Sequence, residues 1–255
     1  MTLSLIPLPD IPLIRPGDHL ADILLSSLDA GGITLQDGDI IVLAQKIVSK
    51  AEGRLVDLAT VMPSSQAHEL AERCAKDPRL VELILRESNA VLRVRPGTII
   101  VEHSLGFISA SAGIDHSNVH GDGERPEDWV LLLPVDPDRS AAEIRKQLEA
   151  ASGKRLGVMI IDSHGRAWRL GTVGVAIGLS GLPGVVDQRG WEDLFGYRLQ
   201  ITVVGVADEL AAAASLVMGQ AAEGTPAVHV RGFPYPLREG TLREILRPKE
   251  EDLFR

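Results

Sequence analysis

Two short runs of apolar residues constrain the fold of this chain more than any other feature. Ile40–Leu43 and Leu156–Ile161 contain no charged or strongly polar side chain. Runs of this length without polar alternation are typical of strands buried on both faces of a sheet. The second run leads directly into Asp162-Ser163. Because open α/β sheets bind ligands at the carboxyl ends of buried strands, this dipeptide is a candidate site.

The remaining elements mix helices and strands without strict alternation, which predicts an α+β fold of mixed sheets with surrounding helices. We expect one domain, residues 1–255, organised as two interleaved lobes. Helices are predicted over Asp18–Leu28, Ser64–Ala75, a segment from Pro78, Ser140–Ala151 and Ala207–Met218. Further strands are predicted around Val91–Val94, Ile99–Val101, Phe107–Ile108, Val130–Leu133, Gly171–Gly178 and Ala227–Val230. The acidic segment Gly121–Asp128 is expected to be a mobile loop.

Charge and composition exclude several classes of protein. The chain has 26 Lys+Arg against 35 Asp+Glu, a net charge of −9, which argues against nucleic-acid binding. Its one cysteine, Cys74, cannot form an intrachain disulfide and is expected to be a buried structural thiol. Prolines interrupt the apolar N-terminus, and no run reaches the roughly 20 residues of a membrane span. We therefore expect a soluble cytoplasmic protein with no membrane partner.

Common catalytic motifs are missing from the sequence. There is no Walker A motif, no G-x-G-x-x-G, no H-E-x-x-H, no C-x-x-C pair and no G-x-S-x-G. Any nucleotide, metal or hydrolytic chemistry must therefore use a different arrangement of residues.

Oxygen-bearing side chains form the first candidate constellation. Asp162 with the neighbouring Ser163 hydroxyl suits Mg²⁺ or Mn²⁺ near phosphates, whereas the structural alternative is an aspartate that caps a turn at His164-Gly165. Asp115 follows a run of small residues and is a candidate second carboxylate, with an Asx-type turn as its structural alternative.

Positive and turn-forming segments provide further candidates. Gln45-Lys46 and Lys50, with Arg54, follow the first apolar run and could bind polyphosphate or form a solvated strand end. Arg166 and Arg169 could neutralise an anionic substrate, while Trp168 suits the core equally well. The turn Met218–Thr225 brings Gln220 and Glu223 close together after an alanine-rich helix, although it could be an ordinary helix-to-strand connection.

Four segments, in this order along the chain, carry a family resemblance. They are AQKIVSKAEGR from Ala44, AGID-x-SN from Ala112, DS-x-GR from Asp162 and MGQ-x-x-EG-x-P from Met218. Each is weak alone, but the ordered set resembles the coenzyme F420 γ-glutamyl ligases. The resemblance implies that family's mixed α/β fold and a homodimer. It also implies a GTP-dependent reaction that adds L-glutamate to the deazaflavin F420-0 and then extends the chain through γ-linkages.

The resemblance also implies a set of site residues. Asp115 and Asp162 would bind a first divalent metal, Mg²⁺ or Mn²⁺, and Ser163 and Gln220 a second, with Glu223 as the alternative to Gln220; K⁺ is a further candidate ion. The GTP site would be lined by Ile11, Pro12, Leu13, Ile14, Gln45, Lys46, Lys50, Asn118, Met218, Gly219, Gln220, Ala221, Ala222, Glu223, Gly224 and Thr225. Transfer of the GTP γ-phosphoryl group to a carboxylate would give an acyl phosphate, which the amine of glutamate would attack.

Two other functions fit the residues. A metal-dependent nucleotide or phosphomonoester hydrolase could use the same two aspartates without an acceptor carboxylate. A non-catalytic nucleotide-binding protein would require the aspartates only for its structure.

Overall fold

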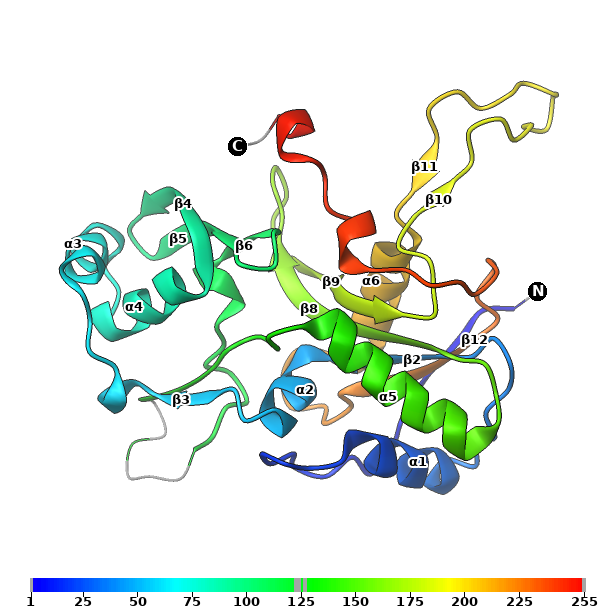
Figure 1. Ribbon diagram of the computed structural model, residues 1–255, viewed down its shortest axis with the longest axis horizontal. Helices are drawn as coiled ribbons and strands as arrows, with labels where there is room; N and C mark the ends of the chain where they lie inside the picture. Colours follow the sequence, from blue (N-terminus) through cyan, green and yellow to red (C-terminus); the bar gives the residue numbers. More distant parts are fainter. Residues whose placement is uncertain (1, 122–124, 126–127, 254–255) are drawn as a thin grey trace.

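A computed structural model of the chain describes residues 2–121, 125 and 128–253 (Figure 1). Its centre is a five-stranded mixed sheet in the order β1-β12-β2-β8-β9. The strands are β1 (Ser4–Pro7), β2 (Ile40–Ala44), β8 (Gly157–Gly165), β9 (Thr172–Ser180) and β12 (Ala227–Arg231). Only β2 and β8 pair in parallel within this sheet. The predicted α+β class with mixed sheets is confirmed.

Both faces of this sheet are covered by helices, as the two apolar runs predict. Ile41 and Leu43 pack toward α1 (Leu20–Ala30) and α5 (Pro137–Ser152), while Ile40 and Val42 pack toward α6 (Val206–Met218). In Figure 1, α5 and α6 lie on opposite sides of β8 and β9. Because side chains alternate across a strand, an entirely apolar strand is the expected solution for a sheet covered on both faces.

A smaller antiparallel sheet is formed by residues that lie between β2 and β8 in the sequence. It contains β4 (Ser88–Arg95), β5 (Thr98–His103) and β6 (Ile108–Ala110), and α3 (Ser65–Cys74) and α4 (Pro78–Arg86) pack against it. A separate two-stranded pair joins β3 (Leu55–Asp57) to β7 (Trp129–Leu131). Cys74 is fully buried in α3, as predicted.

Several boundaries differ from the sequence-based prediction. Residues 45–51 form a helix, α2 (Gln45–Ala51), so the alternative of a solvated, charged strand end is wrong. Strand β8 continues through Gly165, so Asp162 lies inside a strand and does not cap a turn at His164-Gly165. Helix α5 begins at Pro137, before the predicted Ser140, because the Asp136 side chain caps it. Trp168 is 87% exposed at the β8–β9 turn, so the alternative that it belongs to the core is wrong.

An extended β-ribbon, which the sequence analysis missed, projects from the body of the molecule (Figure 1). It begins and ends with β10 (Val186–Asp187) and β11 (Val203–Val204), which pair antiparallel. We call residues 186–204 the arm. The predicted mobile loop Gly121–Asp128 falls mainly on residues 122–124 and 126–127, which lie outside the described residues. None of the helices in the described part of the chain has the length and apolar character needed to cross a bilayer.

Candidate active site at the carboxyl ends of two parallel strands

Four segments that are distant in sequence meet at the carboxyl ends of β2 and β8. They are the start of α2, the loop around Asp115, the last part of β8, and the turn that follows α6. Ala44 and Ile161 are neighbours in the parallel pair, so the residues after each of them begin side by side. The backbone N–H of Ala44 also donates to the carbonyl of Pro226, which holds the turn against the same edge.

Asp115 lies against the first turn of α2. Its Oδ2 accepts hydrogen bonds from Gln45 Nε2 at 2.7 Å and from Lys46 Nζ at 2.8 Å. Burial raises the pKa of the Asp115 carboxyl, the charge of Asp162 raises it further, and Lys46 opposes both effects. The Gln45 side chain is fixed in turn by the Ser49 hydroxyl, which donates to its Oε1 at 2.9 Å. The alternative of a solvated charged segment is therefore wrong for Gln45, which is 1% exposed.

Asp162 is the second carboxylate, and its side chain is only 10% exposed. His164 lies two residues further along β8 on the same side of the strand, with Nε2 3.0 Å from Asp162 Oδ2. The His164 ring in turn contacts Phe107, at a centroid distance of 5.1 Å. The charge of Asp162 raises the pKa of Asp115, so the two carboxylates interact electrostatically. Their binding of a common metal ion stays a prediction.

Ser163 points to the opposite face of β8, because adjacent side chains alternate along a strand. Its hydroxyl donates to Gln220 Oε1 at 2.8 Å, and Gln220 Nε2 donates to Ser215 Oγ at 3.0 Å. Gly174, the strand partner of Ser163, has no room for a side chain, since an added Cβ would lie 2.4 Å from Ser215 Cβ. The predicted pairs therefore occupy two faces, Asp115 with Asp162 on one and Ser163 with Gln220 on the other.

The turn after α6 has a defined conformation. Gly219 has φ +75° and lies against Glu223, so that an added Cβ would approach Glu223 Cδ to 2.2 Å. The Glu223 carboxylate accepts a hydrogen bond from the backbone N–H of Ala221 at 2.7 Å, and backbone N–H groups of the turn lower its pKa. Glu223 thus stabilises the turn, while Gln220 is the member that reaches Ser163. Asn118 joins the turn to the Asp115 loop, because its Nδ2 donates to Ala221 O at 2.8 Å.

Lys50 and the N-terminal segment Ile11–Ile14 are the remaining predicted members of the site. Lys50 Nζ donates to Asn118 O at 2.7 Å, and burial together with the charge of Lys46 lowers the pKa of Lys50. The segment Ile11–Ile14 lies near the far end of α2, where the Gly17 N–H donates to Ala51 O. Within it, Ile14 is buried in the core and Leu13 is 91% exposed.

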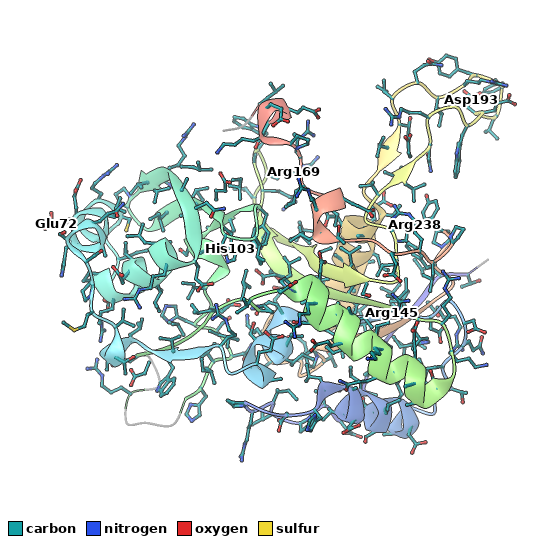
Figure 2. All side chains as sticks on the ribbon, viewed as in Figure 1. Glu72, His103, Arg145, Arg169, Asp193 and Arg238 are labelled. Atoms are coloured by element: carbon teal, nitrogen blue, oxygen red, sulfur yellow. The ribbon has the colours of Figure 1, made fainter. Side chains whose placement is uncertain are left out.

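The other predicted cations do not join this group. Arg54 pairs with Glu87 at 2.8 Å and donates to Leu133 O. Arg166 donates to Gly171 O within its own hairpin. Figure 2 shows Arg169 on that same hairpin, projecting from the body of the molecule.

The donor atoms at this edge fit a hard divalent cation. Carboxylates, a hydroxyl and an amide oxygen are the ligands that Mg²⁺ and Mn²⁺ prefer. Within the described residues, no three His, Cys, Asp or Glu side chains come together as a metal-binding group. An ion on either face would therefore take its remaining ligands from substrate phosphate or water.

Three further residues near the site, His164, Phe107 and His103, were not predicted from the sequence. His103 stacks on Phe107 at a centroid distance of 4.9 Å, and its Nε2 is buried without a hydrogen-bond partner among the described residues. The available signal was the i, i+2 spacing of Asp162 and His164, which places both on one face once the strand is extended to Gly165.

Comparison with known proteins places the chain in a family. A family model described as F420-0:Gamma-glutamyl ligase matches residues 10–232. The coenzyme F420:L-glutamate ligase of Methanothermobacter thermautotrophicus is 50% identical over 100% of both chains. The enzyme of the same name from Methanopyrus kandleri is 47% identical over 100% of this chain and 98% of its own. Both are named ligases, so the hydrolase alternative receives no support. The chain belongs to the F420-0:γ-glutamyl ligase family, whose members form carbon–nitrogen bonds.

Proposed function

We propose that this protein is a GTP-dependent ligase that adds L-glutamate to coenzyme F420-0 and then extends the product through γ-linkages, as a step of F420 biosynthesis. The observation that carries the proposal is the pairing of two poorly solvated carboxylates, Asp115 and Asp162, beside Lys46 at the edge of the sheet. The names of the relatives supply the acceptor and the amino acid.

A carboxylate acceptor must be activated before an amine can attack it, since the leaving group would otherwise be oxide. One oxygen of the acceptor carboxylate would bond to the γ-phosphorus of GTP, and GDP would leave. The neutral amine of glutamate would then form the amide bond, releasing phosphate that carries the acceptor's oxygen and a proton from the amine. The protein contributes positioning and neutralisation of charge, with no covalent enzyme intermediate.

Named residues divide this work between them. Asp115 and Asp162 would hold one divalent ion, and Ser163 with Gln220 a second. Bound ions of this kind neutralise phosphate charge and orient the γ-phosphoryl group. Lys46 and Lys50 lie one helical turn apart on α2 and would contact phosphate oxygens as point charges. The turn Met218–Thr225 offers backbone N–H groups next to them, and Asn118 keeps that turn in place.

We also propose that the protein functions as a homodimer, with the arm at the interface. Five large apolar residues on the arm are at least 51% exposed: Trp191, Leu194, Phe195, Tyr197 and Ile201. Their burial would remove roughly 700 Å² from water, close to the ~800 Å² per partner of a standard interface. The arm holds its shape, because Asp193 accepts the N–H groups of Phe195 and Tyr197 at its tip (Figure 2). Light scattering of a Leu194→Ser/Phe195→Ser variant tests this proposal, since it should give the mass of one chain.

An omission experiment tests the ligase proposal. GDP release is measured with GTP, Mn²⁺, glutamate and F420-0 together, and again with the acceptor or glutamate left out. A ligase releases GDP with glutamate addition and slows at least ~10-fold when the acceptor is absent. GDP release that is unchanged without both acceptor and glutamate would replace the proposal with a hydrolase.

A further inference from the structure

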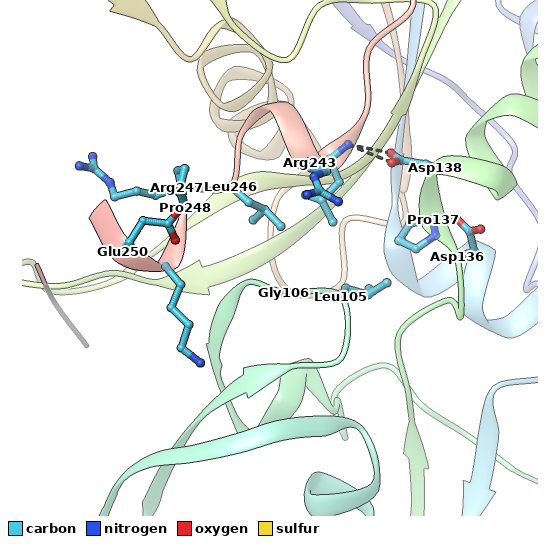
Figure 3. A pocket seen from close by; sticks show the side chains of 12 residues that line it. Leu105, Gly106, Asp136, Pro137, Asp138, Arg243, Leu246, Arg247, Pro248 and Glu250 are labelled. Carbon is cyan, nitrogen blue, oxygen red and sulfur yellow. Dashed lines mark hydrogen bonds between the residues drawn. The ribbon is translucent and has the colours of Figure 1, made fainter. Parts of the chain in front are cut away.

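A surface cavity lies between the C-terminal segment, the start of α5 and the turn between β5 and β6 (Figure 3). Its volume of about 630 Å³ is within the range of small-molecule pockets. The apolar part of its wall comes from Leu105, Leu242 and Leu246, which belong to the core beneath α5. None of its lining residues is among the site residues predicted from the sequence.

The charged side chains around this cavity differ in whether they have hydrogen-bond or ion-pair partners. Asp138 accepts hydrogen bonds from the N–H groups of Leu179 and Leu242, and Asp136 caps α5, so both carboxylates have structural partners. In contrast, neither Arg243 nor Arg247 makes a hydrogen bond or ion pair with another residue that the structure describes. Figure 3 shows the Arg243 guanidinium between Leu246 and Asp138, with Arg247 extending from the rim. Lys249 pairs with Glu102 at 3.5 Å, and Glu250 is the one lining carboxylate for which the described residues offer no partner, so the charge without a partner at the cavity is mainly positive.

The cavity adjoins the candidate active site. Leu105 and Gly106 line it and immediately precede Phe107, whose ring packs against His164. His164 contacts Asp162, and both project from the face of β8 that α5 covers. A chain of contacts through Phe107 and His164 therefore connects the segment that lines the cavity to the Asp162 carboxylate.

We propose that this cavity binds the γ-linked glutamyl chain of the growing product, with Arg243 contacting its free carboxylates and Arg247 contacting them at the rim. The inference rests on the proposed function, since it requires repeated addition of glutamate. Each γ-linked residue keeps a free α-carboxylate, while its nitrogen is held in an uncharged amide. Such a chain is a polyanion without an ammonium group, which matches a site where two guanidinium groups without partners outnumber the one such carboxylate, Glu250.

Two measurements test this assignment on the full-length protein. The first is calorimetric titration with N-acetylated γ-linked triglutamate, compared with the same peptide bearing carboxamides in place of its α-carboxylates. The second is KM for acceptors that carry either no glutamate or one. The variant is Arg243→Gln/Arg247→Gln, and the matched control is Arg93→Gln, at an exposed position on β4. Thermal unfolding of each variant checks that the fold is kept.

The proposal predicts that the charged peptide binds at least ~5-fold more weakly to the double variant than to the parent or the control, and that the carboxamide peptide binds poorly to all three. The ratio of KM for the one-glutamate acceptor to KM for the unmodified acceptor should rise at least ~5-fold in the double variant. Peptide affinity and KM ratio that match the control, in a protein that still adds glutamate, would overturn the inference alone. Absence of glutamate addition in the parent protein would instead overturn the proposed function.

Discussion

Replacing Asp115 with asparagine should leave the fold nearly as stable as before, whereas the same change at Asp39 should destabilise it strongly. Both carboxylates contact cations, but burial affects them differently. Burial raises the pKa of Asp115 above its ordinary value despite Lys46. At Asp39, burial also acts to raise the pKa, but hydrogen bonds from Arg231, His229 and the Gln36 N–H outweigh it and lower the pKa.

The raised pKa of Asp115 and the lowered pKa of Asp39 have opposite consequences for the free energy of unfolding. A carboxyl whose pKa is lowered on folding stabilises the protein above its unfolded pKa, and this stabilisation is lost as pH falls through the folded value. Asp39 belongs to this class. A carboxyl whose pKa is raised on folding destabilises the protein at neutral pH, and this cost disappears as the pH falls below the unfolded value. Asp115 belongs to this class, so its ionised carboxylate lowers the free energy of unfolding at neutral pH.

The expected magnitudes follow from these contacts. Asp39 is 1% exposed and accepts from Arg231 at 2.7 Å and His229 at 2.8 Å. Its loss leaves a buried network without its anion, at a cost of about 3–5 kcal/mol, or a fall in Tm of about 10 °C. Asp115→Asn loses an ion pair with Lys46 in which each side chain is 26% exposed, worth about 1 kcal/mol, but regains the cost of burying the carboxylate charge. The net change should therefore stay within about 1 kcal/mol, or about 3 °C.

Thermal unfolding in EDTA at pH 7.5 measures both variants beside the parent, and GDP release measures their activity. We expect Asp115→Asn to unfold near the parent temperature while losing activity at least ~100-fold. A fall in Tm for Asp115→Asn as large as that for Asp39→Asn would refute the reasoning, because Asp115 would then be a structural residue. Activity retained with an unchanged Tm would refute its catalytic assignment.

Three further predictions concern the turn, the hydroxyl and the buried histidine. Gly219→Ala should weaken GTP binding at least ~10-fold by calorimetry, because the added Cβ would clash with Glu223. In the control Gly165→Ala the added Cβ has no atom within 4 Å, so this variant should bind GTP like the parent. Ser163→Ala should weaken Mn²⁺-dependent GTP binding about 10-fold, while Ser163→Thr should retain it because threonine keeps the hydroxyl. Equal losses of binding in both variants would argue against a role for the hydroxyl. Burial, with smaller contributions from His164 and Arg54, lowers the pKa of His103 to about 4 from 6.5. The free energy of unfolding should therefore fall as the pH drops from 6.5 to 4. His103→Gln should make this pH dependence weaker in denaturant titrations.

The central strands were predictable, but their polar continuations were not. The apolar runs at Ile40–Leu43 and Leu156–Ile161 identified β2 and β8, because a strand buried on both faces has apolar residues at every position. The end of β8 was missed because Asp162, Ser163 and His164 are polar, and only the pairing with β9 keeps them in the strand. Helix α2 was missed because it follows the strand without a proline, glycine or side-chain cap to separate them.

The site depended on information that the local sequence does not contain. Spacing alone could not bring Asp115 next to Asp162, since they are joined through the pairing of Asp115 with Leu131 and the packing of α2. The ordered resemblance identified both residues, and the structure then showed that Ser163 and Gln220 form a separate pair on the other face. The cavity beside Arg243 was not foreseen, because its walls come from three distant segments that carry no motif.

The most direct test of the account follows the oxygen atoms of the acceptor. F420-0 labelled with ¹⁸O in its acceptor carboxylate is incubated with GTP, Mn²⁺ and L-glutamate, and both products are analysed by mass spectrometry. Activation through an acyl phosphate predicts glutamate-sized mass increments on the deazaflavin, with one labelled oxygen in the phosphate released by the first addition. Phosphate from later additions carries no label, because the carboxylate then activated belongs to an added, unlabelled glutamate. A product with one glutamate and no labelled phosphate, or the absence of glutamate-sized increments while GTP is consumed, would contradict it.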